Sequence, residues 1–327
     1  MHVTRVGLGA WAMGGGAWAY SLGPQDDRDS VATIRHAVVA GVNWIDTAAA
    51  YGLGHSERVI ARALRDIPEA ERPYVFTKAG LVWDESDRSL EPRKIGTPTS
   101  IRGEVDASLR RLQTDRIDLY QMHWPPTDGT PLEDYWQTLL DLKTEGKVRA
   151  VGLSNHDVAQ LEAAEALGHV DSLQPVFNAI HRDAAADVVP WCTEHGTGVI
   201  VYSPMASGLL SGAYTAERAA SLDEGDRWRT VHPDFTGEAV PRNLAVADLL
   251  RTVAGRHTMS VAAVAVAWTL AFPITGAIVG ARTPEQLDGW LTAATTSLEP
   301  ADLDEIAAGI RHIGAGSGPE HPKHDDR

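Results

Sequence analysis

Residues 119–153 read LYQMHWPPTDGTPLEDYWQTLLDLKTEGKVRAVGL. The stretch opens with a short apolar run, Leu119–His123, and closes with another, Val148–Leu153. Between them Leu132–Glu145 is amphipathic, and Gly146 follows at the point where a helix should stop. The order of strand, helix and strand predicts two parallel strands joined by a helical crossover.

The same alternation runs through the whole chain. Further strands are predicted at Arg5–Leu8, Asn43–Asp46, Tyr74–Lys78, Ser172–Pro175, Gly198–Tyr202 and Ala277–Val279. Helices are predicted between them at Asp29–Ala40, Ser56–Leu64, Ile101–Leu112, Val158–Leu167, Ala186–His195, Arg242–Arg256, Val261–Leu270 and Pro284–Ala294. Eight strand–helix units favour an α/β fold closed as a (β/α)8 TIM barrel, with residues 1–313 forming one domain.

A doubly wound open sheet is the alternative architecture. It is disfavoured because no G-x-G-x-x-G opens a helix after the first strand; Gly14-Gly15-Gly16 lacks that spacing. Two long connections, Leu81–Ser100 and Ser203–Pro241, follow strands, so a barrel places both at its C-terminal face, where active sites form.

Composition narrows the class of protein. The 327 residues carry a formal net charge of -15, which disfavours nucleic acid and anionic membranes as partners. The single cysteine, Cys192, fits a packed thiol in a reducing compartment. No signal peptide and no apolar run of about 20 residues is visible, so a cytoplasmic location is expected. The polar, Gly/Pro-rich residues 314–327 are expected to be a disordered tail.

Polar residues recur at the carboxyl ends of the predicted strands. They are Asp46, Lys78, His123, Gln174 and Tyr202. Strand side chains alternate in direction, so His123 shares a face with Leu119, and Lys78 shares one with Tyr74. If those faces point inward, the polar end residues converge over the mouth of the barrel.

Tyr51 lies in the loop that leaves the second strand, five residues after Asp46. A phenol is a weak acid at neutral pH, and a nearby ammonium is expected to lower its pKa. Lys78 can supply that charge while Asp46 holds Lys78, and His123 can orient a substrate oxygen. Taken singly, each of these residues is ordinarily a cap, a solvated charge or a packing residue. Their joint placement predicts a site that protonates a carbonyl oxygen during hydride transfer.

At these residues the sequence resembles the aldo-keto reductase superfamily, and it resembles a bacterial NADPH-dependent branch in its Trp-rich start. The matching strings occur in family order: Gly7-Leu8-Gly9-Ala10-Trp11; Ile45-Asp46-Thr47-Ala48 with Tyr51-Gly52; Phe76-Thr77-Lys78; Asp118-Leu119-Tyr120-Gln121-Met122-His123-Trp124-Pro125; Gly152-Leu153-Ser154-Asn155; Gln174-Pro175-Val176-Phe177-Asn178; Tyr202-Ser203-Pro204; and Ile278-Val279-Gly280-Ala281. The resemblance implies a catalytic tetrad of Asp46, Tyr51, Lys78 and His123, with Tyr51 as the general acid in reduction and the base in oxidation.

The resemblance also implies a nicotinamide cofactor. Ser154, Asn155 and Gln174 would hold its carboxamide, and Tyr202 would stack on its ring. Contacts to the diphosphate and to the adenosine ribose would come from Ser203, Met205, Ser207 and Gly208, and from Gly280, Arg282 and Gln286 respectively. Arg282 precedes the helix that begins at Pro284 and could pair with a 2′-phosphate, so the expected cofactor is NADP(H).

Two departures from the family pattern weaken that expectation. Ala213 stands where many relatives carry a lysine, and Gly289-Trp290 stands where many carry Glu-Asn. Trp290 could cover the adenine or simply pack.

The expected substrate is a small carbonyl or alcohol compound, and no metal site is predicted. Trp18, Trp83 and Trp124 fall in loops above the predicted barrel mouth and could form its walls, or could anchor the loops. His232 and Phe235 could form a lid. Two other functions remain open: a nucleotide-sensing regulatory subunit, and a non-redox lyase or isomerase that uses Tyr51 and Lys78 for proton abstraction.

Overall fold

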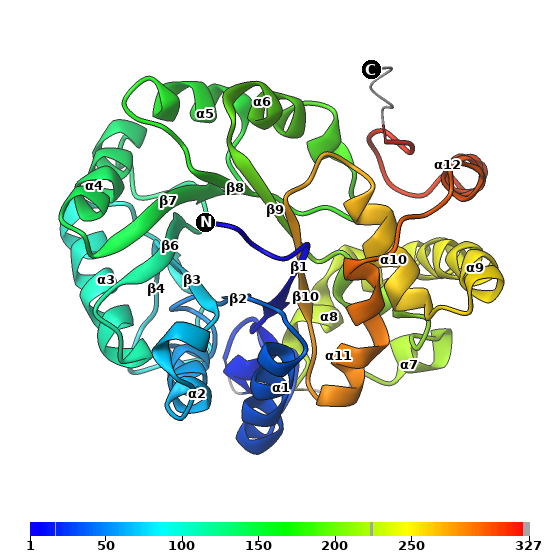
Figure 1. Ribbon diagram of the computed structural model, residues 1–327, viewed down its shortest axis with the longest axis horizontal. Helices are drawn as coiled ribbons and strands as arrows, with labels where there is room; N and C mark the ends of the chain where they lie inside the picture. Colours follow the sequence, from blue (N-terminus) through cyan, green and yellow to red (C-terminus); the bar gives the residue numbers. More distant parts are fainter. Residues whose placement is uncertain (17, 223–224, 323–327) are drawn as a thin grey trace.

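The computed structural model describes residues 1–16, 18–222 and 225–322. Across these ranges eight parallel strands close into a barrel in the order β1-β10-β9-β8-β7-β6-β3-β2 (Figure 1). They are β1 (Val6–Gly9), β2 (Trp44–Asp46), β3 (Tyr74–Ala79), β6 (Ile117–Met122), β7 (Val148–Ser154), β8 (Ser172–Gln174), β9 (Gly198–Tyr202) and β10 (Gly276–Gly280). Because β1 pairs with both β2 and β10, the sheet has no open edge. The TIM barrel is confirmed, and the open sheet is excluded.

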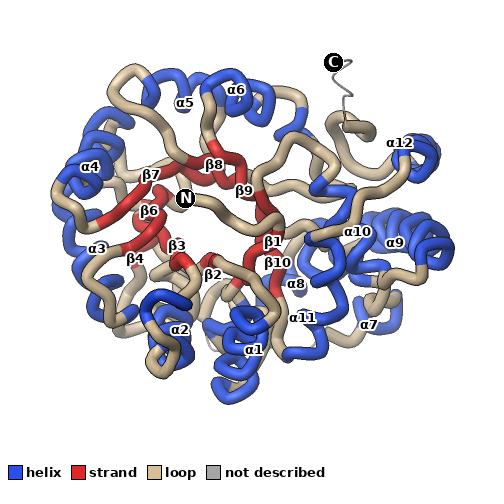
Figure 2. The backbone as a smooth tube through the Cα atoms, in the orientation of Figure 1, coloured by secondary structure: helices blue, strands red, loops and turns tan. Residues whose placement is uncertain are grey.

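Helices form an outer ring around the strands (Figure 2). They are α1 (Asp27–Val39), α2 (His55–Leu64), α3 (Pro98–Leu112), α4 (Leu132–Thr144), α5 (Val158–Glu165), α6 (Val188–His195), α9 (Ala239–His257), α10 (Val261–Leu270), α11 (Pro284–Leu291) and α12 (Pro300–Ile313). In the part of the chain that the structure describes, no helix is both long and apolar enough to cross a bilayer.

Helix α12 was not expected from the sequence. Its start carries two readable signals, Pro300 at the first turn and a reciprocal capping arrangement between Glu299 and Asp302. Its buried face is spaced as a helix requires, with Leu303, Ile306 and Ile310 in the core.

The two long connections contain regular structure of their own. The first holds an antiparallel hairpin, β4 (Leu81–Val82) and β5 (Arg93–Lys94). The second holds α7 (Ala216–Ala220) and α8 (Arg227–Val231). Short 3-10 turns complete the described ranges: η1 (Ala12–Gly14), η2 (Glu69–Glu71), η3 (Asp183–Ala185), η4 (Ala206–Ser211), η5 (Pro233–Phe235) and η6 (Thr292–Ala294).

The barrel interior is apolar in its lower layers. Trp44, Phe76, Leu119, Ala150, Ile200 and Ile278 form one buried cluster there. Gly7 leaves room for the Trp44 ring, because a Cβ at this position would lie 2.2 Å from the indole. The N-terminal segment crosses the ring at this end (Figure 1), and Thr4 donates from its backbone N–H to Asn43 at 2.8 Å. Apolar side chains therefore fill the N-terminal end of the barrel interior, and polar side chains lie toward its C-terminal mouth.

The start of the expected tail is packed against the body. Ala315 is buried, the Ser317 hydroxyl donates to Asp183 at 2.8 Å, and the Arg182 backbone N–H donates to the Ser317 carbonyl at 3.2 Å. This packing differs from the disorder expected for residues 314–327. Residues 323–327 lie outside the described residues.

Candidate active site

Asp46 and Lys78 meet at the carboxyl ends of adjacent strands, β2 and β3. The Lys78 ammonium donates to the Asp46 carboxylate at 2.6 Å and to the Thr47 carbonyl at 2.8 Å. Both side chains are almost fully buried. Burial raises the pKa of Asp46 and lowers the pKa of Lys78, and the ion pair opposes both changes. A buried pair of this geometry is a fixed, internally balanced dipole beneath the barrel mouth.

Tyr51 lies directly above this pair. The Lys78 ammonium is 5.3 Å from the centre of the Tyr51 ring, and the His123 ring centre is 5.8 Å away on another side. Gly52 has a φ of 59°, and a Cβ there would lie 2.0 Å from the Gly14 carbonyl oxygen. The Tyr51 loop can pack against η1 in this way only if a glycine follows the tyrosine.

The expected lowering of the Tyr51 pKa is wrong for this geometry. Burial raises the pKa of Tyr51 well above its usual value, and the negative charge of Asp46 adds to the increase. The Lys78 ammonium faces Asp46 at 2.6 Å, so its charge is already balanced. Tyr51 is therefore a protonated phenol at neutral pH.

His123 completes the group after the end of β6. Its backbone N–H donates to the Ala79 carbonyl at 3.0 Å, which fixes the loop next to β3. Burial, followed by the charges of Lys78 and Lys94, lowers the pKa of His123 well below its usual value. The imidazole is neutral at physiological pH, so it can donate or accept one hydrogen bond without bringing charge.

Four residues predicted to hold the nicotinamide lie beside the tetrad, at the ends of β7, β8 and β9 or directly after them. They also contact one another. The Ser154 hydroxyl donates to the Gln174 carbonyl at 2.8 Å, and Gln174 donates from its side chain to Asp46 at 2.9 Å. Asn155, in a left-handed conformation, donates to the His123 carbonyl at 3.1 Å and accepts from the Tyr202 hydroxyl at 2.9 Å. This network joins the predicted cofactor side of the barrel to the tetrad.

The loop after β9 carries the predicted diphosphate contacts. Three consecutive residues, Ala206, Ser207 and Gly208, have positive φ. Successive backbone N–H groups in such a conformation can form an anion-binding concavity. Ser203 also has a positive φ, and Met205 precedes the turn. Arg229 donates to the Ser207 carbonyl at 2.8 Å, so a cation lies at this loop although residue 213 is alanine.

Arg282 lies after β10, with its guanidinium engaged by backbone. It donates to the carbonyls of Leu22 and of Pro24, the latter at 3.2 Å. The Gln286 side chain accepts from the Arg282 backbone N–H at 2.9 Å, whereas Gly280 is exposed at the end of its strand. Trp290 is 1% exposed and packs in the core, which decides between the two roles considered for it.

The three predicted substrate tryptophans separate in the structure. Trp18 is buried, with its ring centre 6.4 Å from that of Tyr51. Trp124 follows His123 and lies 4.5 Å beneath the Lys94 ammonium. Trp83 lies instead over the guanidinium of Arg111, at 5.8 Å, on the outer side toward α3. The first two border the tetrad, and Trp83 does not contact it.

Other aromatic residues in the wall were not predicted as substrate contacts. Trp11 stacks on Tyr51 at 6.4 Å, and Trp228 of α8 packs edge-on against Trp11 at 5.2 Å. Tyr20 meets Trp228 at 6.2 Å, and His232 meets it at 4.6 Å. Trp11 ends the Gly-Leu-Gly-Ala-Trp string, so its position directly after β1 was the available signal. Trp228 had none, because its loop reaches the mouth only through tertiary packing.

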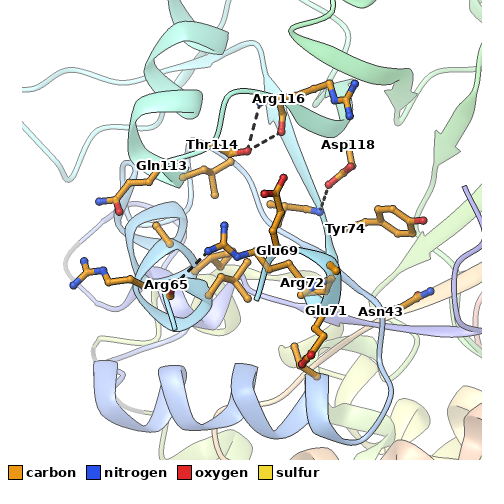
Figure 3. A pocket seen from close by; sticks show the side chains of 18 of the residues that line it. Asn43, Arg65, Glu69, Glu71, Arg72, Tyr74, Gln113, Thr114, Arg116 and Asp118 are labelled. Atoms are coloured by element: carbon orange, nitrogen blue, oxygen red, sulfur yellow. Dashed lines mark hydrogen bonds between the residues drawn. The ribbon is translucent and has the colours of Figure 1, made fainter. Parts of the chain in front are cut away.

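A wide groove of about 1000 Å³ lies at the other end of the barrel (Figure 3). Asn43 and Tyr74, at the starts of β2 and β3, line it, whereas Asp46 and Lys78 lie at the opposite ends of these strands. The Asp118 carboxylate there accepts from the Val75 backbone N–H at 2.9 Å and pairs with Arg149 at 3.0 Å. These contacts serve the N-terminal face of the barrel, which contributes to stability rather than to chemistry.

Comparison with known proteins gives a consistent result. The profile of the Aldo/keto reductase family matches residues 5–310. The NADH-specific methylglyoxal reductase of Escherichia coli (strain K12) is 34% identical, with 92% of each chain covered. Aldo-keto reductase YhdN of Bacillus subtilis (strain 168) is 33% identical over 94% of this chain and 89% of its own length. The structure of the glycerol dehydrogenase AKR11B4 from Gluconobacter oxydans superposes with a TM-score of 0.85 at 34% identity, covering 97% and 94% of the two chains. With its closed barrel and its matched sequence, the chain belongs to the aldo/keto reductase family and is an oxidoreductase of carbonyl compounds.

Proposed function

We propose that the chain transfers a hydride between NADP(H) and a small aldehyde, ketone or sugar carbonyl, with Tyr51 as the proton donor. The observation that supports this most directly is the buried Asp46–Lys78 pair beneath a tyrosine ring, with Lys78 5.3 Å from the ring centre. A neutral histidine lies with its ring centre 5.8 Å from that of the tyrosine.

The donor set on β7 to β9 fits a nicotinamide. Ser154, Asn155 and Gln174 would hold the carboxamide, and Tyr202 would lie against the ring. The left-handed turn at 206–208, with Arg229 beside it, suits a diphosphate. When bound, the cofactor supplies or accepts the hydride at the substrate carbon.

The chain's own residues manage the proton. Tyr51 is protonated at neutral pH because burial raises its pKa, so it can donate to the carbonyl oxygen as negative charge develops there. His123 is neutral and can orient that oxygen by one hydrogen bond. Lys78, paired with Asp46, offsets the negative charge of this carboxylate, which would otherwise oppose formation of the phenolate. A protonated phenol at neutral pH favours the reductive direction.

The preference for NADP(H) over NAD(H) depends on Arg282. Its backbone lies just before α11, whose N-terminus favours an anion, and its guanidinium would pair with a 2′-phosphate after releasing the loop carbonyls of Leu22 and Pro24. We expect Arg282→Ala to raise the KM for NADPH much more than the KM for NADH. Equal effects on both would assign Arg282 to loop packing, and NADH would then be the expected cofactor, as the name of the E. coli relative states for that protein.

Steady-state consumption of NADPH and NADH with a panel of aldehydes tests the function itself. Tyr51→Phe should abolish turnover while cofactor binding, followed by quenching of tryptophan fluorescence, is retained. Tyr74→Phe, at the opposite end of the barrel, is the matched control and should be silent. Cofactor binding without turnover on any substrate would support a regulatory subunit. Turnover without nicotinamide oxidation would support a lyase or isomerase.

A further inference from the structure

We propose that the substrate carries an anionic group, a carboxylate or a phosphate, and that Lys94 binds this group at the mouth of the site. This inference rests on the proposed function, because it names the substrate class of that same site.

Lys94 is held at the C-terminal mouth by its own backbone. It lies on β5 of the hairpin that follows β3, and the neighbouring Ile95 donates to the Gly80 carbonyl at 3.1 Å. The Lys94 carbonyl accepts from the Thr127 backbone N–H at 3.0 Å, which joins the hairpin to the loop after β6. That loop begins with His123 and Trp124. The hairpin is therefore fastened to the part of the site that holds the catalytic histidine.

The Lys94 ammonium lies over an aromatic surface beside this histidine. It is 4.5 Å from the Trp124 ring and only partly exposed. Its charge is one of the causes that lower the pKa of His123, so it acts electrostatically on the site. A cation–π contact positions an ammonium but leaves its N–H donors available for an anion.

No carboxylate within the described ranges lies at ion-pair distance from Lys94. The acidic residues of the surrounding loops have other partners. Asp128 accepts from the backbone N–H groups of Gly96 and Thr130, each at 3.1 Å. Glu104 accepts from the Gly80 backbone N–H at 2.9 Å. Lys94 is thus a cation at the site mouth without an ion-pair partner among the described residues, in a chain with a net charge of -15.

We do not expect the anion that binds Lys94 to belong to the cofactor. The predicted cofactor residues follow β7 to β10, whereas Lys94 follows β3, with β6 between them in the ring. The diphosphate has its own candidate cation at the loop after β9, Arg229, which also pairs with Asp226. Lys94 is thus placed on the substrate side of Tyr51.

The remaining walls complete the description of the substrate. Trp11 and Trp18 flank Tyr51, each with its ring centre 6.4 Å away. A substrate with its carbonyl at Tyr51, a short apolar or sugar body against the tryptophans and an anionic end at Lys94 matches all three features.

Pairs of aldehydes that differ by one anionic group test this inference. We would compare 4-carboxybenzaldehyde with 4-methylbenzaldehyde, and glyceraldehyde 3-phosphate with glyceraldehyde, for the wild type and for Lys94→Met. In the wild type, kcat/KM should favour at least one anionic partner, and the two pairs distinguish carboxylate from phosphate. Lys94→Met should reduce that preference about tenfold, mainly through KM, because the anion contributes binding away from the reacting atoms. Lys94→Glu should reverse it.

Lys147→Met is the matched control. Lys147 pairs with Asp106 at 2.7 Å and lies just before β7, at the opposite end of the barrel, so this variant removes the same charge without touching the mouth. Lys147→Met should keep the wild-type preference for the anionic aldehyde over its neutral partner. A second readout is ionic strength: added salt should raise the KM for the anionic aldehyde in the wild type and much less in Lys94→Met.

Neutral aldehydes that are reduced as well as their anionic partners by the wild type would overturn the inference. So would an anionic preference that survives in Lys94→Met. Either result leaves the reductase function intact, because the neutral aldehydes and Tyr51→Phe report on that function separately. Thermal unfolding of Lys94→Met should stay close to that of the wild type, since the substitution removes one cation–π contact and no ion pair.

Discussion

The side-chain amide of Gln174 donates a 2.9 Å hydrogen bond to the same Asp46 carboxylate that binds Lys78. Because β8 and β2 are not neighbours in the ring, this bond crosses the interior of the barrel. It holds Asp46 from a second direction, so the charge beneath Tyr51 is fixed by two strands besides its own. The following predictions concern this charge and its surroundings.

Comparing Asp46→Asn with the double variant Asp46→Asn, Lys78→Met should separate the effect of the ion pair on stability from its effect on catalysis. The single variant leaves the Lys78 ammonium buried without a counter-ion, which should cost about 3–5 kcal/mol in the free energy of unfolding. Turnover should fall at least about 100-fold, because Lys78 is no longer held in place. The double variant Asp46→Asn with Lys78→Met should regain most of the stability, as measured by urea unfolding, but no turnover. A double variant that turns over like the wild type would exclude the pair from the chemistry.

The rate of reduction should be insensitive to pH through the neutral range. Tyr51 must be protonated to donate, and burial places its pKa well above the usual value, so the rate should fall only in strongly alkaline solution. Oxidation requires the phenolate and should rise about tenfold per pH unit over the same range. His123 has a lowered pKa, so no acidic limb is expected near its usual pKa of about 6.5. Initial rates in both directions check this, and an acidic limb near about pH 6.5 that disappears in His123→Gln would contradict it.

Acid should destabilise the fold through His156. This imidazole donates from Nδ1 to the Ser154 carbonyl and accepts from the Tyr135 hydroxyl, each at 2.9 Å. Burial lowers the pKa of His156 to about 4. As pH falls below about 6.5 the unfolded chain binds a proton that the folded chain does not, so stability decreases until the folded group titrates, by about 3 kcal/mol in total. His156→Gln should flatten urea-unfolding stability against pH by about one proton over this range. Parallel curves for the two proteins would show that His156 is not the group.

Two tryptophans should respond differently to the same substitution. Trp18→Ala removes a ring next to Tyr51 and should raise the KM for aldehydes several-fold or more. Trp83→Ala should leave that KM unchanged, because Trp83 packs on Arg111, which in turn pairs with the buried Glu57. Its effect should appear in the midpoint of thermal unfolding. A large increase in the KM for aldehydes in Trp83→Ala would show that Trp83 does contact the substrate.

The meeting of Asp46, Tyr51, Lys78 and His123 could be predicted because it depends on local sequence. Asp46, Lys78 and His123 each stand at the end of an apolar strand, and closure of the barrel brings strand ends together whatever the details of the helices. Tyr51 follows from its short distance along the chain to Asp46. These residues needed only the order of strands and the alternation of side chains.

Other features depend on contacts that no local pattern encodes. The raised pKa of Tyr51 follows from complete burial and from the balance of Lys78 by Asp46, and neither is visible in a linear sequence. Trp83 directly follows β4 in a hairpin whose direction is set by its pairing with β5, and its ring lies against Arg111. Helix α12 is the exception: its cap at Glu299 and its apolar spacing were readable.

The pairing of β1 with β10 has a consequence for how this chain reaches its fold. Val6 lies opposite Ala277. The strand pair that closes the barrel therefore joins segments that leave the ribosome about as far apart in time as the chain permits. Until the second of them emerges, β1 presents an unsatisfied edge to other growing chains. Synthesis at low temperature or with a chaperone present should therefore improve the soluble yield more than any change at the catalytic mouth.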